Sequence, residues 1–338
     1  MKRESNFELL RIVAMMMVLL VHCNYFSIGK VTPEDISAAP LDSFVKAFAE
    51  QLCIVCVNVF VLISGWFGIR PSLKGITSFL YQILFYHILI SCVLLTVDDA
   101  ASPKLLFSFI FQDSYWFIQA YLILYCLSPT LNPFIEKSPV RQYLMVLATF
   151  FLLEFAFGWA SNANGASFRS GYSAVSFVGL YLLAGFLRRY KKWHRKLSAS
   201  KSFLLYILFT IIPVSIYFLT KNYMQMLSYC SPFVIAASVF FFLTFQKMKL
   251  SSQFINSLGT SAFAIFLIHL HPYLCEHYRS SMLWAYELLG GGFYLVACIV
   301  FAICFGLLCM SIDKLRLLTW KPINEKIKAF GQKNHPNL

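Results

Sequence analysis

Apolar residues recur along the chain in ten runs that are separated by shorter polar stretches. A membrane-spanning helix needs about 20 mostly apolar residues, and most of these runs approach that length. The runs cover residues 7–26, 50–68, 76–97, 114–134, 142–159, 173–187, 203–220, 230–246, 260–277 and 291–311. We therefore predict an all-α, polytopic integral membrane bundle of about ten transmembrane helices, in which residues 1–338 form a single domain.

Composition supports the membrane class. The chain is 59% hydrophobic and only 13% charged, with a mean hydropathy of +0.68. Soluble domains are typically about half apolar and a quarter charged. These values exclude an ordinary soluble domain.

The basic residues predict the orientation of the bundle. If the N-terminus is cytoplasmic, 21 of the 28 Lys and Arg residues fall on the cytoplasmic side, six fall on the other side and Arg11 lies in the membrane. Cytoplasmic loops carry such an excess of basic residues. We therefore expect both termini to be cytoplasmic. Membrane topology also accounts for the net charge of +13, so we expect no nucleic-acid partner.

The first apolar run contains two ionisable residues, Arg11 and His22. Their separation of eleven residues corresponds to a rotation of about 20° and a rise of roughly 16 Å along a helix, so they share one helix face. Arg11 alone could extend to lipid headgroups, and His22 alone could hydrogen-bond a neighbouring helix. Their alignment instead favours a polar cavity along this helix, because ionisable residues inside a membrane are usually functional.

Further polar residues lie inside the later runs. Antiparallel pairing of the first two helices would bring Asn58 toward the level of His22, and Arg70 toward the level of Arg11. Glu154 is predicted at the depth of His22, where a carboxylate must be protonated, paired or hydrated.

Other candidates for the cavity lining are Ser64, Trp116, Gln119, His269 and His271. Trp116 equally suits the aromatic belt at a membrane interface. Pro272 predicts a kink in the ninth helix. The lone Cys-x-x-Cys pair at residues 53–56 lacks further ligand residues nearby, so we predict no metal site.

Four segments resemble membrane acyltransferase family 3. They are the Arg-x10-His pattern of Arg11 and His22, VNVFVLISGWFGIR at residues 57–70, WFIQAYLILYCLSP at residues 116–129 and AIFLIHLHP at residues 264–272. They occur in the family's order, and the resemblance covers essentially the whole chain.

The resemblance implies a bacterial membrane protein that O-acylates surface polysaccharides or related sugars. It implies that His22 is the catalytic residue and that Arg11 and Arg70 bind the acyl-CoA donor. Many family members have an Arg-x-Arg pair after the second helix, whereas this chain has Gly68 at the first of these positions. Donor binding would then depend on fewer charges.

The expected chemistry is transfer of an acyl group, most simply acetyl, from cytoplasmic acyl-CoA to a sugar hydroxyl. Imidazole suits the role of general base because its unperturbed pKa is about 6.5. Asn58 and Glu154 are alternative partners that would orient His22. We expect acyl-CoA as a co-substrate, no tightly bound cofactor, a glycan or lipid-linked sugar as acceptor and membrane lipid as surroundings, and we leave a homo-oligomer open.

Two other functions would use a similar cavity. A transporter or flippase of lipid-linked saccharides also places ionisable residues inside the membrane, and a membrane sensor or scaffold would only bind a ligand there. Acylation of a glycan that depends on a thioester donor would separate the enzyme from both.

Overall fold

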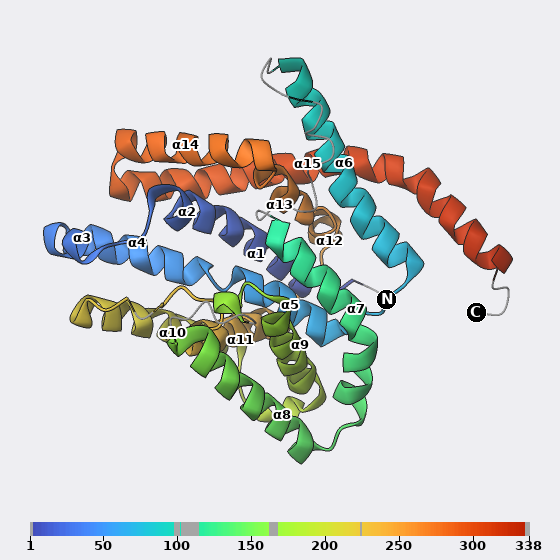
Figure 1. Cartoon of the computed structure of the whole chain (residues 1–338), viewed down its shortest axis with the longest axis horizontal. Coiled ribbons are helices and arrows are strands. Elements are labelled where there is room, and N and C mark those ends of the chain that lie inside the picture. Colours follow the sequence, from blue (N-terminus) through green and yellow to red (C-terminus); the bar gives the residue numbers. More distant parts are fainter. Residues whose placement is uncertain (1–2, 98–101, 103–114, 162–167, 224, 335–338) are drawn as a thin grey trace.

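Helices make up nearly all of the structure (Figure 1), a computed structural model that describes residues 3–97, 102, 115–161, 168–223 and 225–334. These residues contain no strand. The α-helices are α1 (Ser5–Cys23), α2 (Tyr25–Ile28), α3 (Pro33–Ala38), α4 (Pro40–Cys53), α5 (Cys56–Phe67), α6 (Leu73–Val97), α7 (Trp116–Lys137), α8 (Val140–Leu153), α9 (Ala174–Arg189), α10 (Ala199–Thr220), α11 (Pro232–Lys247), α12 (Gln253–Gly259), α13 (Phe263–His269), α14 (Pro272–Leu289) and α15 (Gly291–Asn334). Short helices of other types cover Glu154–Ala160, Arg169–Gly171 and Lys191–Trp193. The all-α prediction is confirmed.

Six of the described helical segments are long and apolar enough to cross a membrane, and a bent pair of segments makes a seventh. The helices α9 and α11 contain 16 residues each, which corresponds to a length of about 24 Å against a hydrocarbon core of about 30 Å. Ten crossings and the cytoplasmic location of the termini therefore stay predictions. The predicted first residue of the fourth helix, at position 114, lies outside the described residues.

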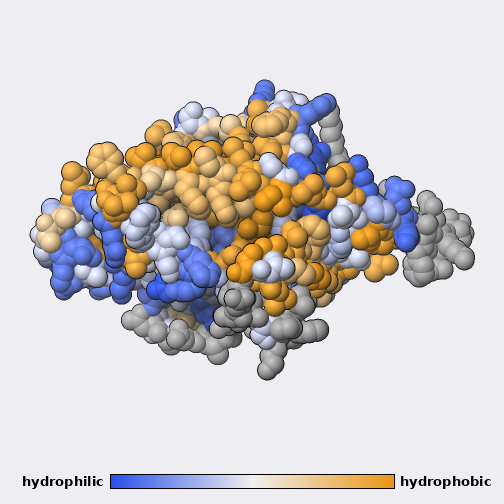
Figure 2. Space-filling model, turned by 90° about the horizontal axis from the view of Figure 1, so that it is seen from above, coloured by the Kyte–Doolittle hydropathy of each residue, from blue (hydrophilic) through white to orange (hydrophobic). Residues whose placement is uncertain are grey.

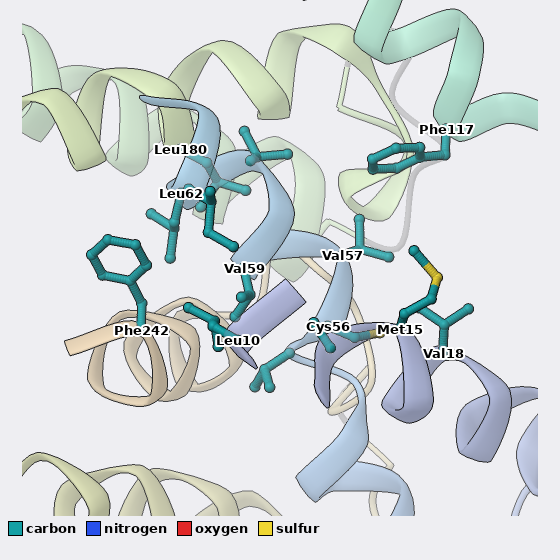
Figure 3. Close-up of a cluster of buried hydrophobic side chains, with 14 of the residues drawn as sticks. Leu10, Met15, Val18, Cys56, Val57, Val59, Leu62, Phe117, Leu180 and Phe242 are labelled. Carbon is teal, nitrogen blue, oxygen red and sulfur yellow. The ribbon is translucent and has the colours of Figure 1, made fainter. Parts of the chain in front are cut away.

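Helix α1 lies at the centre of the bundle and contacts α4, α5 and the helices from α11 to α15 (Figure 1). Its first turn is held by side chains, since Asn6 donates a hydrogen bond to the Phe245 carbonyl (3.0 Å) and Ser5 donates one to the Ser252 carbonyl (3.2 Å). Figure 3 shows a cluster of buried apolar side chains to which this helix contributes Leu10 and Met15 and α5 contributes Val59 and Leu62.

Helices α5 and α9 pack closely because Gly65 has no side chain. A Cβ atom at Gly65 would lie 2.9 Å from the Tyr181 Cα and 2.9 Å from the Ala184 Cβ, and it would overlap the Tyr181 carbonyl oxygen. Small residues allow such close approach of helix backbones in membranes. The Ser-Gly pair of the VNVFVLISGWFGIR segment thus has a structural role.

We expect Gly65→Ala to destabilise the protein by about 1–3 kcal/mol, because the obstructing atoms belong to backbone and the helices must move apart. Thermal unfolding of the purified variant in detergent would measure this loss. Gly292→Ala is the matched control, since a Cβ atom at Gly292 meets nothing within 4 Å. Equal stability of Gly65→Ala and Gly292→Ala would contradict the role given to Gly65.

The predicted helix at 50–68 begins too late. The structure has a span from Pro40 to Phe67, formed by α4 and α5. The polar residues Asp42, Lys46 and Glu50 interrupt the apolar pattern of the sequence over α4, although Pro40 at the first helical position is a good helix start.

The predicted helix at 260–277 is broken. The segment Gln253–His269 meets Pro272–Leu289 at an angle of 83°. Pro272 is the first residue of α14 rather than an interior residue, so it begins a new helix instead of kinking one. His269 is therefore the last residue of α13.

The last predicted helix, 291–311, ends too early, since α15 continues to Asn334. Asp313 and Arg316 stop the apolar run in the sequence, but they pair with each other inside the protein. The Asp313 Oδ1 atom lies 2.6 Å from the Arg316 Nε and accepts a hydrogen bond of 2.8 Å from the Tyr86 hydroxyl of α6. The pairing offsets the cost of burying these charges.

The outer surface of the bundle suits a lipid environment. Figure 2 shows hydrophobic residues over most of the middle of one face, with hydrophilic residues gathered toward its ends. Large apolar side chains such as Phe293 and Val296 of α15 are mostly exposed. Such a surface would be unusual for a soluble monomer.

Candidate functional site

His22 hydrogen-bonds a second histidine at the broken helix. The His22 Nδ1 lies 2.8 Å from the His269 Nε2, and the His269 Nδ1 lies 2.6 Å from the Ile265 carbonyl oxygen. His269 is buried, with 1% of its surface exposed. Both predicted residues are thus brought together from opposite ends of the chain.

The order of these contacts determines where the protons lie. A carbonyl oxygen can only accept, so the His269 Nδ1 carries a hydrogen, and in the neutral ring the His269 Nε2 is an acceptor. The His22 Nδ1 must then be the donor. The remaining nitrogen of His22, Nε2, has a lone pair that can accept a proton.

A cavity of about 700 Å³ adjoins His22. Met15, Val18 and His22 of α1 line it, and they continue the face on which Arg11 lies, at spacings of four, three and four residues. The other lining residues come from α2, α4, α5, α7, α13, α14 and the segments around residues 170 and 227. The lining is mostly apolar, and it includes the imidazole group of His22, the carboxyl group of Glu50 and several hydroxyl groups.

Arg11 pairs with an acidic residue on its own helix. Its Nη1 lies 2.6 Å from the Glu8 Oε1, and the Arg3 Nη1 lies 3.0 Å from the same oxygen. Glu8 is 3% exposed, and Gly259 leaves the space that its side chain occupies. Two arginines around one carboxylate leave a net positive charge at this end of α1.

Arg70 follows the C-terminal end of α5, which lies close to Arg11. It is exposed and follows Phe67 by three residues, and the Arg11 guanidinium stands 5.9 Å from the centre of the Phe67 ring. The turn between them uses Gly68 at φ +75°, a conformation that favours glycine. The absence of an arginine at position 68 therefore has a backbone reason.

The two predicted partners of His22 are placed elsewhere. The Asn58 amide donates a hydrogen bond of 2.9 Å to the Tyr229 carbonyl. Glu154 is buried near Ser176, at the start of the Glu154–Ala160 π-helix. The hydrogen bond that orients His22 comes from His269 instead.

The other predicted lining residues have four different environments. Trp116 borders the cavity, and Gln119 is on an exposed position of α7. The Oγ atom of Ser64 on α5 lies 3.3 Å from the hydroxyl oxygen of Tyr121 on α7, and Tyr121 is close to Arg11. His271 is buried with its ring centre 5.2 Å from that of His87 on α6.

Two features of the site are absent from the sequence predictions. One is Glu50, a buried residue that lines the cavity. The other is an aromatic wall formed by Trp116, Tyr172 and Tyr229, in which Tyr172 lies 4.6 Å from Trp116 and 4.8 Å from Tyr229 between ring centres. Glu50 has a sequence signal, since a helix that starts at Pro40 places it within a span.

The tyrosines of this wall keep their hydroxyl hydrogens. Burial raises the pKa of Tyr172 to about 12, and burial also raises the pKa of Tyr229. Both hydroxyls can therefore donate hydrogen bonds at neutral pH. Within the described ranges, no group of three or more His, Cys, Asp or Glu side chains could hold a metal ion.

Comparison with known proteins gives one match. A family model described as an acyltransferase domain matches residues 4–311, a range that includes both histidines of the pair and the whole cavity lining. Among curated proteins and solved structures, nothing matches the chain.

Proposed function

The chain belongs to the acyltransferase-domain family, and from this premise we propose that it is an integral membrane O-acyltransferase. It moves an acyl group, acetyl in the simplest case, from cytoplasmic acyl-CoA to a hydroxyl group of a surface polysaccharide or lipid-linked sugar. It acts in the inner membrane of a bacterium. The observation that carries the proposal is the His22–His269 pair at the cavity wall.

The proposed reaction begins with removal of a proton. The His22 Nε2 takes the proton of the acceptor hydroxyl as that oxygen attacks the thioester carbon. His269 accepts a hydrogen bond from His22 Nδ1–H throughout, which holds the ring in place and favours its charged form. The carbon–sulfur bond then breaks, and the imidazolium returns the proton to the leaving thiolate.

Arg11 and Arg70 are proposed to bind the phosphates of the donor. Arginine can bind phosphate through two parallel hydrogen bonds. The rise of roughly 16 Å from Arg11 to His22 along α1 is comparable to an extended pantetheine arm. The donor would then be held at one end of α1 while its thioester reaches the other.

Mass spectrometry of surface glycans tests the function directly. A strain with the gene should carry an acyl mass that a strain without the gene lacks, and purified protein should transfer the same group from acyl-CoA. Identical glycans in both strains would contradict acyl transfer and favour transport. The family match supports transfer and gives no support to the transporter hypothesis.

Substitution of the two arginines tests the donor site. We expect Arg11→Ala and Arg70→Ala each to weaken CoA binding about tenfold or more, because a charge-assisted contact is worth roughly 1.5–3 kcal/mol. Lysine should restore binding only in part, since it lacks the planar fork. Calorimetry with CoA on detergent-purified protein would measure this.

Arg141→Ala, an exposed residue at the start of α8, is the control and should bind CoA normally. Wild-type affinity in both Arg11→Ala and Arg70→Ala would remove these residues from the donor site, whatever their activity.

A further inference from the structure

Glu50 is a buried acidic residue in the cavity that the proposed reaction does not use. It lies on α4 with 3% of its surface exposed, and it lines the same cavity of about 700 Å³ as His22. It also borders a smaller pocket beside Tyr25 and Lys46. Burial of a carboxyl group is costly, so its presence in this wall requires an explanation.

Only part of the Glu50 carboxyl group is satisfied. The Oε2 atom accepts a hydrogen bond of 3.3 Å from the Tyr25 backbone N–H. The Oε1 atom is buried and has no hydrogen-bond partner among the described residues. Nearly all buried polar atoms in native proteins have partners, so this oxygen is available to a water molecule or to a ligand in the cavity.

The position of Glu50 relative to His22 is held by the backbone. Tyr25, which donates to Glu50, follows His22 by three residues. The neighbouring Asn24 donates a hydrogen bond of 3.0 Å to the Lys46 carbonyl, one turn before Glu50 on α4. These two contacts fasten α4 to the end of α1, and they give the carboxyl group a defined place relative to His22, as precise sites require.

The surrounding wall suits a molecule with several hydroxyl groups. Trp116, Tyr172 and Tyr229 present aromatic surface next to Glu50 and His22 in the same cavity. A largely aromatic lining with a few convergent polar groups is typical of small-molecule sites. The tyrosine hydroxyls and the Glu50 carboxyl group line the same cavity, so both kinds of group can form hydrogen bonds with an alcohol.

We propose that Glu50 binds a hydroxyl group of the acceptor that neighbours the one to be acylated. A hydrogen bond between this neighbouring hydroxyl group and the Oε1 atom of Glu50 turns the hydroxyl to be acylated toward the His22 Nε2. Glu50 thereby selects the position of acylation. This inference depends on the proposed O-acyltransferase function and assigns its acceptor a pair of neighbouring hydroxyl groups.

The test compares variants in a strain that lacks the gene. The strain is complemented with the wild type, Glu50→Leu, Glu50→Gln and the control Glu34→Gln, which changes a carboxyl group of α3 that does not line the cavity. The strain's own glycan is the probe. Mass spectrometry and NMR of the isolated glycan measure the amount of acyl group and the carbon that carries it, and gel filtration of detergent extracts measures folded protein.

We expect Glu50→Leu to lower acylation per folded protein by roughly five- to 100-fold, the loss associated with leaving a buried hydroxyl group without its hydrogen-bond partner. The remaining acyl groups should be spread over neighbouring carbons. Glu50→Gln keeps an acceptor oxygen and should give an intermediate rate, and Glu34→Gln should match the wild type.

Three results would overturn the inference. Wild-type acylation at the wild-type carbon in Glu50→Leu would show that a water molecule is the only partner of this oxygen. A lower amount that follows folded protein, with the carbon unchanged, would show a purely structural role. No acylation by the wild type would overturn the proposed function and this inference with it.

Discussion

His22→Ala should lower the rate of acyl transfer by about 10²- to 10⁴-fold, the usual contribution of a general base. The substitution removes the nitrogen that accepts the hydroxyl proton. It also removes the donor to His269 Nε2, but His269 keeps its contact with the Ile265 carbonyl, so the fold should survive. The rate of transfer from acyl-CoA in purified protein, normalised to monodisperse protein in detergent, would measure the effect.

His277→Ala is the matched control, because His277 is an exposed histidine on α14. It should transfer at the wild-type rate. Near-normal turnover in His22→Ala would remove His22 from the catalytic role. Loss of monodisperse protein together with loss of activity would instead indicate that His22 is needed for folding.

Arg316→Ala should destabilise the protein by about 3–5 kcal/mol, because it leaves the Asp313 carboxylate buried without its cation. Asp313 is 0% exposed and Arg316 is 3% exposed. The guanidinium donates two hydrogen bonds, from Nε at 2.6 Å and from Nη2 at 2.9 Å. Unfolding in mixed detergent and denaturant would measure the loss.

Two comparisons make this test specific. Lys321→Ala changes an exposed cation on the same helix and should be within about 0.5 kcal/mol of the wild type. The double variant Asp313→Leu with Arg316→Met should recover much of the loss, because an apolar pair replaces the ion pair without an unpaired charge. A double variant as unstable as Arg316→Ala would contradict the account.

Much of the fold follows from apolar runs alone, and the errors occur where charged residues are buried inside the protein. Asp313 and Arg316 end an apolar run in the sequence, but a pair three residues apart on one helix lets α15 continue. Lys46 and Glu50 hide α4 for a different reason, because Glu50 is buried in the cavity wall and has no ion pair among the described residues. A count of apolar residues treats each charge as exposed, so it shortens these helices.

The candidate site is only partly predictable from spacing. The helical period places Arg11, Met15, Val18 and His22 on one face, and this can be predicted because all four residues belong to one helix. The partner of His22 depends on where the chain bends by 83° at the end of α13, and Asn58 and Glu154 have other neighbours. The position of a residue along its helix can be predicted from the sequence, whereas the neighbours that its side chain meets depend on how the helices pack.

The histidine pair also has a consequence for synthesis of the chain. His22 and His269 are separated by 247 residues, which a ribosome adds in roughly 12–50 s at about 5–20 residues per second. During that interval α1 is in the membrane without α13, and its basic nitrogen has no orienting partner. The histidine pair is assembled only after α13 has been made, so a nascent or truncated chain that ends before α13 has His22 without its hydrogen bond to His269.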